Sequence, residues 1–144
     1  MSFSDMLESA IPGSRNFSWR EALWLKKWHI YAIPPQAVEK NIIETAMRLT
    51  LIRSFLAAPL TVTSWYRPPS YNEIIGGAPQ SQHMLGKACD FTVAGMSADE
   101  VRERLRPKLG EFNLRMEDLP QSSWVHIDTA CPADLPLHKR FFKP

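Results

Sequence analysis

The sequence has few residues of the kinds that cross-link a chain or bind metal ions. Its 144 residues include only two cysteines and four histidines. Cys89 and Cys131 can form at most one disulfide, and their spacing matches neither a zinc knuckle nor a Cys-x-x-Cys redox motif. We therefore interpret both as buried thiols. The sequence excludes a disulfide-rich scaffold, and any metal site has to draw on a small set of histidines.

Long apolar runs and a strong charge of one sign are also missing. The longest mostly apolar stretch, from Met47 to Leu60, is interrupted by charge and is shorter than the roughly 20 residues that span a membrane. The first residues lack a basic region followed by an apolar one, so we expect no secretory signal and synthesis in the cytoplasm. Seventeen Lys and Arg against fifteen Asp and Glu form no basic stripe. We expect neither a nucleic-acid partner nor membrane insertion.

Length and composition indicate one globular domain. Apolar residues make up 44% of the chain and charged residues 22%, which is typical of folded domains. A chain of this size removes roughly 68–70% of its unfolded surface from water, so it can fold without a structural metal. Because the first residues are polar and marked by Gly and Pro, we divide the chain into an N-terminal arm, 1–15, and a domain, 16–144.

Capping patterns, prolines and apolar spacing predict three helices. A capping box at 18–21 begins a helix that we expect over 19–28. Two prolines and the apolar stripe after them predict a long helix over about 35–55. A second capping box begins a helix that we expect over 98–109.

Strand patterns dominate the second half of the chain. Apolar alternation and β-branched residues predict four strands, over 60–64, 88–93, 113–116 and 124–129, with a polar loop over 67–82. Helices come first and most strands later. This order predicts an α+β fold in a single domain, an antiparallel sheet with helices packed on one side.

Two of the histidines lie in segments that also carry carboxylates. A mononuclear hydrolytic zinc site needs three protein ligands and an open position for water, and His83, Asp90 and His126 can supply the ligands. His126 and Asp128 are two residues apart in one predicted strand, so both point to the same face, whereas Cys89 points away from Asp90 toward the core. Such residues are also common as hydrogen-bonded surface groups. Ligand type and spacing alone leave both interpretations open.

The order of these residues resembles a known signature. Residues 81–90 read Ser-x-His-x-x-Gly-x-Ala-x-Asp, and a His in a later strand follows. This pattern resembles metallopeptidase family fifteen, the zinc D-Ala-D-Ala peptidases, which includes D-Ala-D-Ala carboxypeptidases, dipeptidases and the L-Ala-D-Glu peptidases of phage endolysins. Segments 16–21, 63–68, 71–72, 76–78 and 81–83 are similar to the carboxypeptidase branch, subfamily A. The resemblance covers about residues 16–130.

The resemblance implies a zinc-dependent peptidase that hydrolyses peptidoglycan stem-peptide bonds, of D,D-carboxypeptidase or L,D-endopeptidase type, with metal-activated water. It implies one zinc ion per chain on His83, Asp90 and His126. Arg67 matches the family arginine near the scissile carbonyl, where a permanent positive charge can stabilise the oxyanion. Substrate binding is implied for three further residues, Tyr66, Ser81 and Gln82. We expect a monomer that acts on stem peptides, and a phage-encoded enzyme released to the cell wall would fit the missing secretory signal.

One position departs from the family pattern. Well-studied members carry Glu or Asp three residues before the last zinc-binding His, where this sequence has Ser123, which cannot act as the general base. Three interpretations follow. Asp128 is the base, which we favour; Glu117 or Asp118 serves instead; or the site binds zinc and hydrolyses poorly. Asp128 could alternatively orient a ligand imidazole.

If the site binds zinc and hydrolyses poorly, an alternative function follows, that of a zinc-binding phage structural or wall-binding module with weak or no activity. Ser123 is the only residue that motivates this alternative function. A zinc-free interaction domain is a third alternative.

Overall fold

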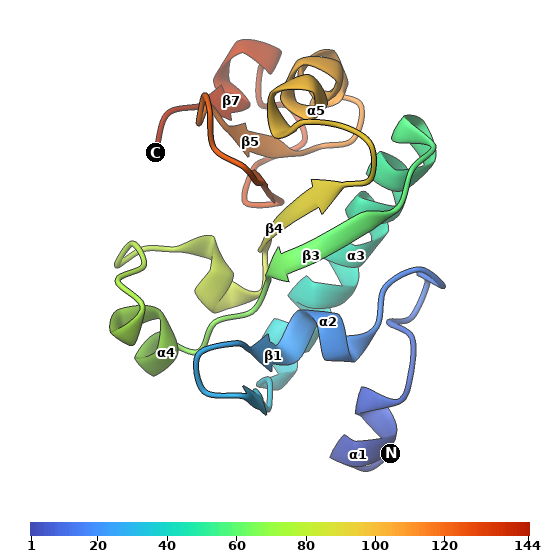
Figure 1. Ribbon diagram of the computed structural model, residues 1–144, viewed down its shortest axis with the longest axis vertical. Coiled ribbons are helices and arrows are strands. Elements are labelled where there is room, and N and C mark those ends of the chain that lie inside the picture. Colours follow the sequence, from blue (N-terminus) through green and yellow to red (C-terminus); the bar gives the residue numbers. More distant parts are fainter.

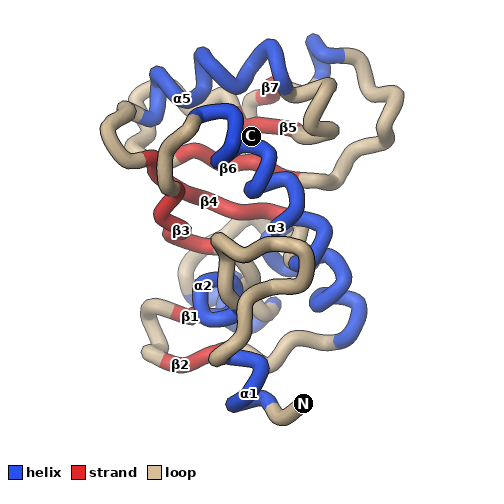
Figure 2. The backbone as a smooth tube through the Cα atoms, turned by 90° about the vertical axis from the view of Figure 1, so that its right-hand side faces the viewer, coloured by secondary structure: helices blue, strands red, loops and turns tan.

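The computed structural model describes residues 1–144 and is built around a five-stranded sheet with the order β3-β4-β6-β5-β7 (Figures 1 and 2). The strands are β3 (Leu60–Ser64), β4 (Ala88–Val93), β5 (Arg115–Glu117), β6 (Val125–Asp128) and β7 (Phe141–Phe142). All neighbours pair antiparallel except β5 and β7, which pair parallel. The predicted α+β fold is confirmed, with this one parallel pair as a difference.

The remaining elements surround this sheet. The helices are α1 (Phe3–Leu7), α2 (Trp19–Leu23), α3 (Gln36–Leu56), α4 (Pro69–Ile74) and α5 (Ala98–Leu105), the 3-10 helices are η1 (Gln82–Leu85), η2 (Arg106–Lys108) and η3 (Leu137–Lys139), and a small hairpin consists of β1 (Trp24–Leu25) and β2 (Ile30–Tyr31). No helix, including the 21-residue α3, is both long and apolar enough to cross a membrane.

Local sequence signals account for where the helices begin. At α2 the Ser18 hydroxyl accepts a hydrogen bond from the Glu21 backbone N–H, and the Glu21 carboxylate accepts one from the Ser18 N–H. Ser97 caps α5 by accepting from the Glu100 N–H. Helix α3 begins after Pro35 and ends near its predicted boundary. These starts agree with the predictions.

Tertiary pairing changes several predicted boundaries. The helix predicted over 19–28 ends at Leu23, because the next two residues pair with Ile30 and Tyr31 in the β1–β2 hairpin. The predicted loop over 67–82 contains α4, with Pro69 in its first turn. The helix predicted over 98–109 changes to a 3-10 turn at Arg106, because the following Pro107 lacks the N–H that an α-helix would use.

One face of the sheet forms the hydrophobic core. Alternate residues of β4 and β6 point into it, and Cys89 is fully buried there, as the alternation predicts. Cys131 is only half-buried, and both thiols are free. The core is completed by buried side chains of α2, α3 and α5, and Figure 1 shows α3 running behind β3 and β4. Residues 1–15 contain α1, and their Ile11 is also part of this core.

The opposite face of the sheet is polar and carries the site described below. A register shift between Val62 and Ser64 on β3 turns Ser64 to this face, opposite Asp90. At the other edge of the sheet, buried Arg140 donates hydrogen bonds to the carbonyl groups of Leu135 and Ala133. These bonds fold the C-terminal segment back, so that β7 lies beside β5 and forms one wall of the polar face.

Gly86 is the glycine on which the local geometry depends most. Its φ is +73°, and an added Cβ would lie 2.9 Å from Ile42 Cγ1 and 3.2 Å from the Val38 carbonyl oxygen. We expect Gly86→Ala to lower the free energy of unfolding by about 1–2 kcal/mol for the positive φ and by about 1–3 kcal/mol more for the overpacking.

Gly95→Ala is the matched control, because Gly95 has a φ of +75° and nothing within 4 Å of an added Cβ. It should show only the backbone part of the loss in urea denaturation followed by tryptophan fluorescence. Equal losses in the two variants would contradict the packing argument.

Candidate metal centre

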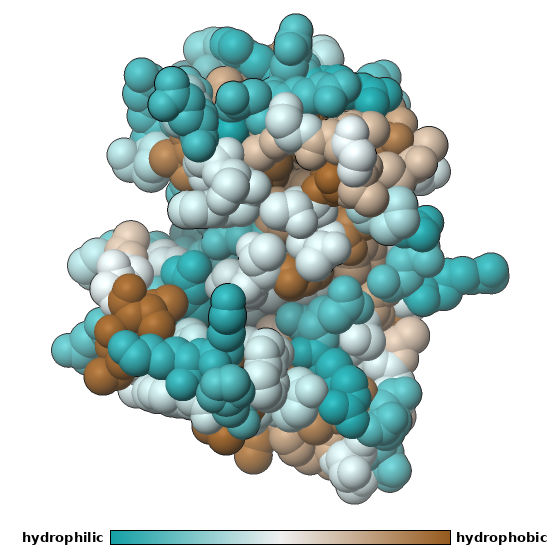
Figure 3. Space-filling view, in the orientation of Figure 1, coloured by the Kyte–Doolittle hydropathy of each residue, from teal (hydrophilic) through white to brown (hydrophobic).

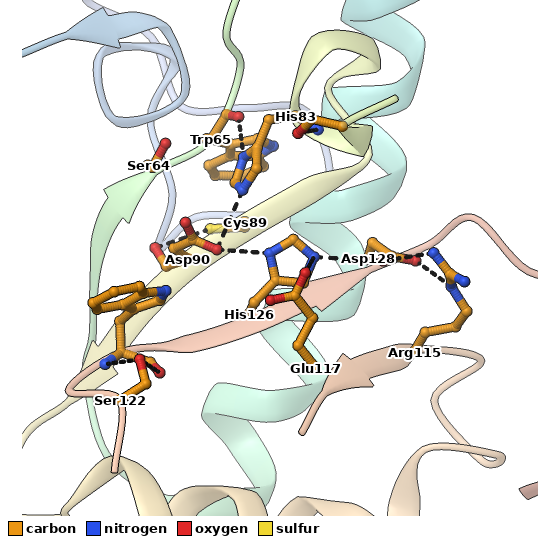
Figure 4. Close-up of polar contacts among 12 residues, drawn as sticks. Ser64, Trp65, His83, Cys89, Asp90, Arg115, Glu117, Ser122, His126 and Asp128 are labelled. Atoms are coloured by element: carbon orange, nitrogen blue, oxygen red, sulfur yellow. Dashed lines mark hydrogen bonds and ion pairs between the residues drawn. The ribbon is translucent and has the colours of Figure 1, made fainter. Parts of the chain in front are cut away.

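Three buried side chains converge on the polar face of the sheet (Figure 4). His83 comes from η1, Asp90 from β4 and His126 from β6. Asp90 Oδ1 lies 2.8 Å from His126 Nδ1 and 3.2 Å from His83 Nε2. One potential ligand atom from each residue lies within 4.8 Å of the others. The structure thus brings together the three residues that the sequence singled out as metal ligands.

The backbone explains this convergence. Asp90 and His126 are register partners in the β4–β6 pair, so their side chains share one face. Gly86, with its positive φ, ends η1 and lets the chain turn from His83 into β4. The His83 Nδ1–H donates to the Trp65 carbonyl oxygen at 2.6 Å. Since a carbonyl can only accept, Nδ1 carries a proton, and this bond fixes the ring so that Nε2 faces Asp90.

The donor set fits a zinc ion. Two imidazole nitrogens and one carboxylate oxygen are the typical three protein ligands of a hydrolytic zinc site, with a fourth position open. His83 Nε2 and Asp90 Oδ1 lie 3.2 Å apart, close enough for both to contact one cation. The group also lines a pocket of about 370 Å³, so water and substrate can reach it. In Figure 3 a notch separates the surface near α4 from the surface over β5 and β7, which both contribute to this pocket.

The charges of these residues are strongly coupled. Burial alone would raise the pKa of Asp90, but hydrogen bonds from His126 and His83 outweigh it and hold the pKa well below its usual range. Burial alone would lower the pKa of His126. Its contacts with Asp128 and Asp90 and the charge of Glu117 outweigh burial and raise that pKa to about 9.

Two carboxylates lie close to the outer nitrogen of His126. Its Nε2 atom is 3.5 Å from Asp128 Oδ2 and 3.7 Å from Glu117 Oε1. Asp128 is 1% exposed and accepts two hydrogen bonds from Arg115, at 2.8 and 3.0 Å. Glu117 has no such partner and lines the pocket, whereas Asp118 does not line it. Glu117 is therefore the more available proton acceptor.

Arg67 also faces the pocket, and its guanidinium is held at three points. Its Nε donates to Ser64 Oγ at 3.0 Å, Nη1 to Asn72 Oδ1 at 3.4 Å and Nη2 to Asp90 Oδ2 at 3.4 Å. Burial lowers its pKa, against the opposing charge of Asp90. An arginine remains protonated under such a shift, so Arg67 places a fixed positive charge beside the three ligands.

The residues implied in substrate binding are placed differently. Ser81 and Gln82 line the pocket, and the Ser81 hydroxyl accepts a hydrogen bond from the His83 N–H at 3.2 Å. Gln82 Oε1 is buried without a hydrogen-bond partner. Tyr66 lies in the hydrophobic core and does not line the pocket, and burial raises the pKa of its phenol.

The pocket residues that the sequence reasoning missed include Arg115 of β5 and Phe142 of β7. Arg115 precedes Glu117 by two residues and so shares its face of the strand. That alternation was a usable signal. No sequence pattern indicated that Phe142 would line the pocket, because the pairing of β7 with β5 joins segments that are distant in the sequence.

We expect zinc binding to release a proton from His126. A metal-ligating imidazole must be unprotonated, and the pKa of about 9 means that His126 is protonated at neutral pH when no metal is bound. Zinc affinity should therefore rise about tenfold per pH unit up to about pH 9. Calorimetric titration at pH 7.5 in buffers of different ionisation enthalpy measures the released proton. His138→Ala, which changes an exposed histidine, should keep the release; unchanged release in His126→Ala would contradict it.

Comparison with known protein families agrees with this geometry. A family model described as Peptidase M15 matches residues 25–128, a range that contains the three ligand candidates, Arg67 and Glu117. A search of curated proteins found no match. The family match spans well over half of the 144 residues. The chain therefore belongs to the peptidase M15 family.

Proposed function

We propose that this peptidase is zinc-dependent and hydrolyses peptide bonds in peptidoglycan stem peptides. The observation that carries the proposal is the buried group of His83, Asp90 and His126 at a polar pocket that also holds Arg67 and Glu117. Ligands, a fixed cation and an available carboxylate are the three components that metal-assisted peptide hydrolysis needs.

Each protein group has a distinct role in the proposed mechanism. When bound, zinc polarises the scissile carbonyl and acidifies a water molecule. Arg67 stabilises the negative charge that develops on the carbonyl oxygen, and its three hydrogen bonds keep it in position. Glu117 accepts the proton of the attacking water and returns it to the leaving amine.

We assign the general base to Glu117 rather than to Asp128, and Asp128 to the orientation of His126. The two oxygens of Asp128 are held by Arg115, and hydrogen bonds from His126 and Arg115 outweigh burial and lower its pKa. Protonating it would break a buried ion pair, which costs about 3–5 kcal/mol. Glu117 accepts no hydrogen bond from an arginine, and its only ion pair is the longer contact with His126 Nε2, at 3.7 Å.

The pocket supports a peptide substrate with small or polar side chains. Most of its lining residues are polar or charged. Ser81 and Gln82 both line it and carry polar groups that can hydrogen-bond to a peptide backbone. The alternative of an inactive binding module started from Ser123; because β5 supplies Glu117 to the same pocket, the missing carboxylate at that position no longer favours it.

The assignment of the base predicts different outcomes for two conservative variants. Glu117→Gln should keep about one zinc per chain but lower kcat by about 10²–10⁴-fold, because proton transfer is lost. Asp128→Asn should instead weaken zinc binding by about 10–100-fold, because His126 loses its orienting partner. Elemental analysis and mass spectrometry of digested muropeptides measure both. A zinc-loaded Glu117→Gln with full activity would move the base elsewhere.

Metal removal tests the proposed function itself. Chelation or His83→Ala should abolish the cleavage of muropeptides, because the remaining two ligands hold zinc weakly. His138→Ala is the control and should keep turnover and zinc content, since His138 is exposed and outside the pocket. Full activity after chelation would reject the mechanism, and zinc-loaded protein that cleaves no wall peptide would favour the non-catalytic alternative.

A further inference from the structure

Arg115 is held rigidly on one side of the pocket. Its Nε and Nη2 atoms donate to the two oxygens of Asp128, and its Cζ lies 4.4 Å from the centre of the Phe142 ring. Burial alone would lower its pKa, but the bonds with Asp128 outweigh burial and raise it. The guanidinium is therefore charged and fixed by a bidentate pair and by an aromatic face.

One edge of this guanidinium has no partner in the protein. Nη1 of Arg115 makes no hydrogen bond, whereas all three nitrogens of Arg67 do. The Arg115 side chain is 26% exposed and lines the same pocket as Glu117 and His126. A stacked, weakly hydrated guanidinium with free donors is suited to bind a carboxylate.

The position of Arg115 relative to the reacting groups indicates which part of a substrate it meets. A line of contacts runs from Arg67 through Asp90, His126 and Asp128 to Arg115, so the two arginines lie at its opposite ends. Figure 4 shows the part of this line from Asp90 to Arg115. Arg67 is placed for the scissile carbonyl. The leaving amine receives its proton from Glu117, two residues from Arg115 on the same face of β5.

We propose that Arg115 and Phe142 form a subsite for a carboxylate on the leaving side of the scissile bond. This deepens the proposed function, on which it rests, because it names a substrate feature read by the same pocket. Two sources share this chemistry. One is the free C-terminal carboxylate of a peptide that ends in D-Ala-D-Ala, and the other is the α-carboxylate of D-Glu after L-Ala.

The experiment compares matched peptide pairs on the zinc-loaded protein. The first pair is an acetylated peptide ending in Lys-D-Ala-D-Ala, with a free or amidated C-terminus. The second is an L-Ala-γ-D-Glu peptide, with the α-carboxylate free or amidated. We expect kcat/KM to favour the free carboxylate by on the order of 10- to 100-fold in one of the two pairs, which identifies the source. The same preference should appear in calorimetric binding, which does not require turnover.

Three variants test the residues. Arg115→Gln should lose the preference for the free carboxylate, and Phe142→Leu, which leaves the Arg115–Asp128 pair intact, should reduce it. Arg106→Gln is the matched control, because Arg106 stacks on the neighbouring Phe141 at 4.6 Å but lies outside the pocket. The preference is a ratio measured on one preparation, so a partly unfolded variant still reports it.

The outcomes separate this proposal from the proposed function. Equal kcat/KM and equal binding for the free and the amidated peptide in both pairs would overturn the subsite. A preference for the free carboxylate that persists in Arg115→Gln would overturn it too. Absence of cleavage with a retained binding preference, lost in Arg115→Gln, would instead support the subsite and reject the peptidase function.

Discussion

The buried carboxylate of Asp90 is the group around which the polar face of the sheet is organised. It is 7% exposed and accepts hydrogen bonds or ion pairs from His126, His83 and Arg67. A buried charge without such partners would be strongly unfavourable. Each partner comes from a different segment, so the stability of this one carboxylate requires the β4–β6 register and the positions of η1 and the β3–α4 connection.

Outward from Asp90, the contacts continue through side chains that alternate between basic and acidic. His126 links Asp90 to Asp128, and Asp128 is held in turn by Arg115. These contacts cross from β4 through β6 to β5, on the face opposite the hydrophobic core. Packing on one face and a satisfied ionic network on the other hold the side chains in place before a substrate binds, which is the preorganisation that catalysis requires.

The carboxylate that Ser123 cannot supply is available from another part of the chain. Glu117 reaches the pocket from β5, because β5 pairs with β6 and places it beside His126. A catalytic site is defined by the positions of its groups in space, and the same group can come from a different sequence position. The Peptidase M15 match covers β5 as well as the ligands, so Glu117 lies within the region shared with the family.

Features that depend on residues close together in the chain can be predicted without knowledge of the fold. Capping boxes begin α2 and α5, prolines bound α3, and the spacing around His83 and Asp90, with a later His126, identified the candidate ligands. Their signals lie in a few adjacent residues, where geometry is local. The family resemblance was carried by the same short motifs.

Contacts between segments that are distant in the sequence depend on how the whole chain folds. The β1–β2 hairpin shortened a helix that local pattern favoured, and the parallel pairing of β7 with β5 brought Phe142 to the pocket. The same pairing of strands placed Glu117 and Arg115 near His126 while Tyr66 went to the core. Strand partners are chosen by burial and hydrogen bonding across the whole chain, so no window of sequence contains that choice.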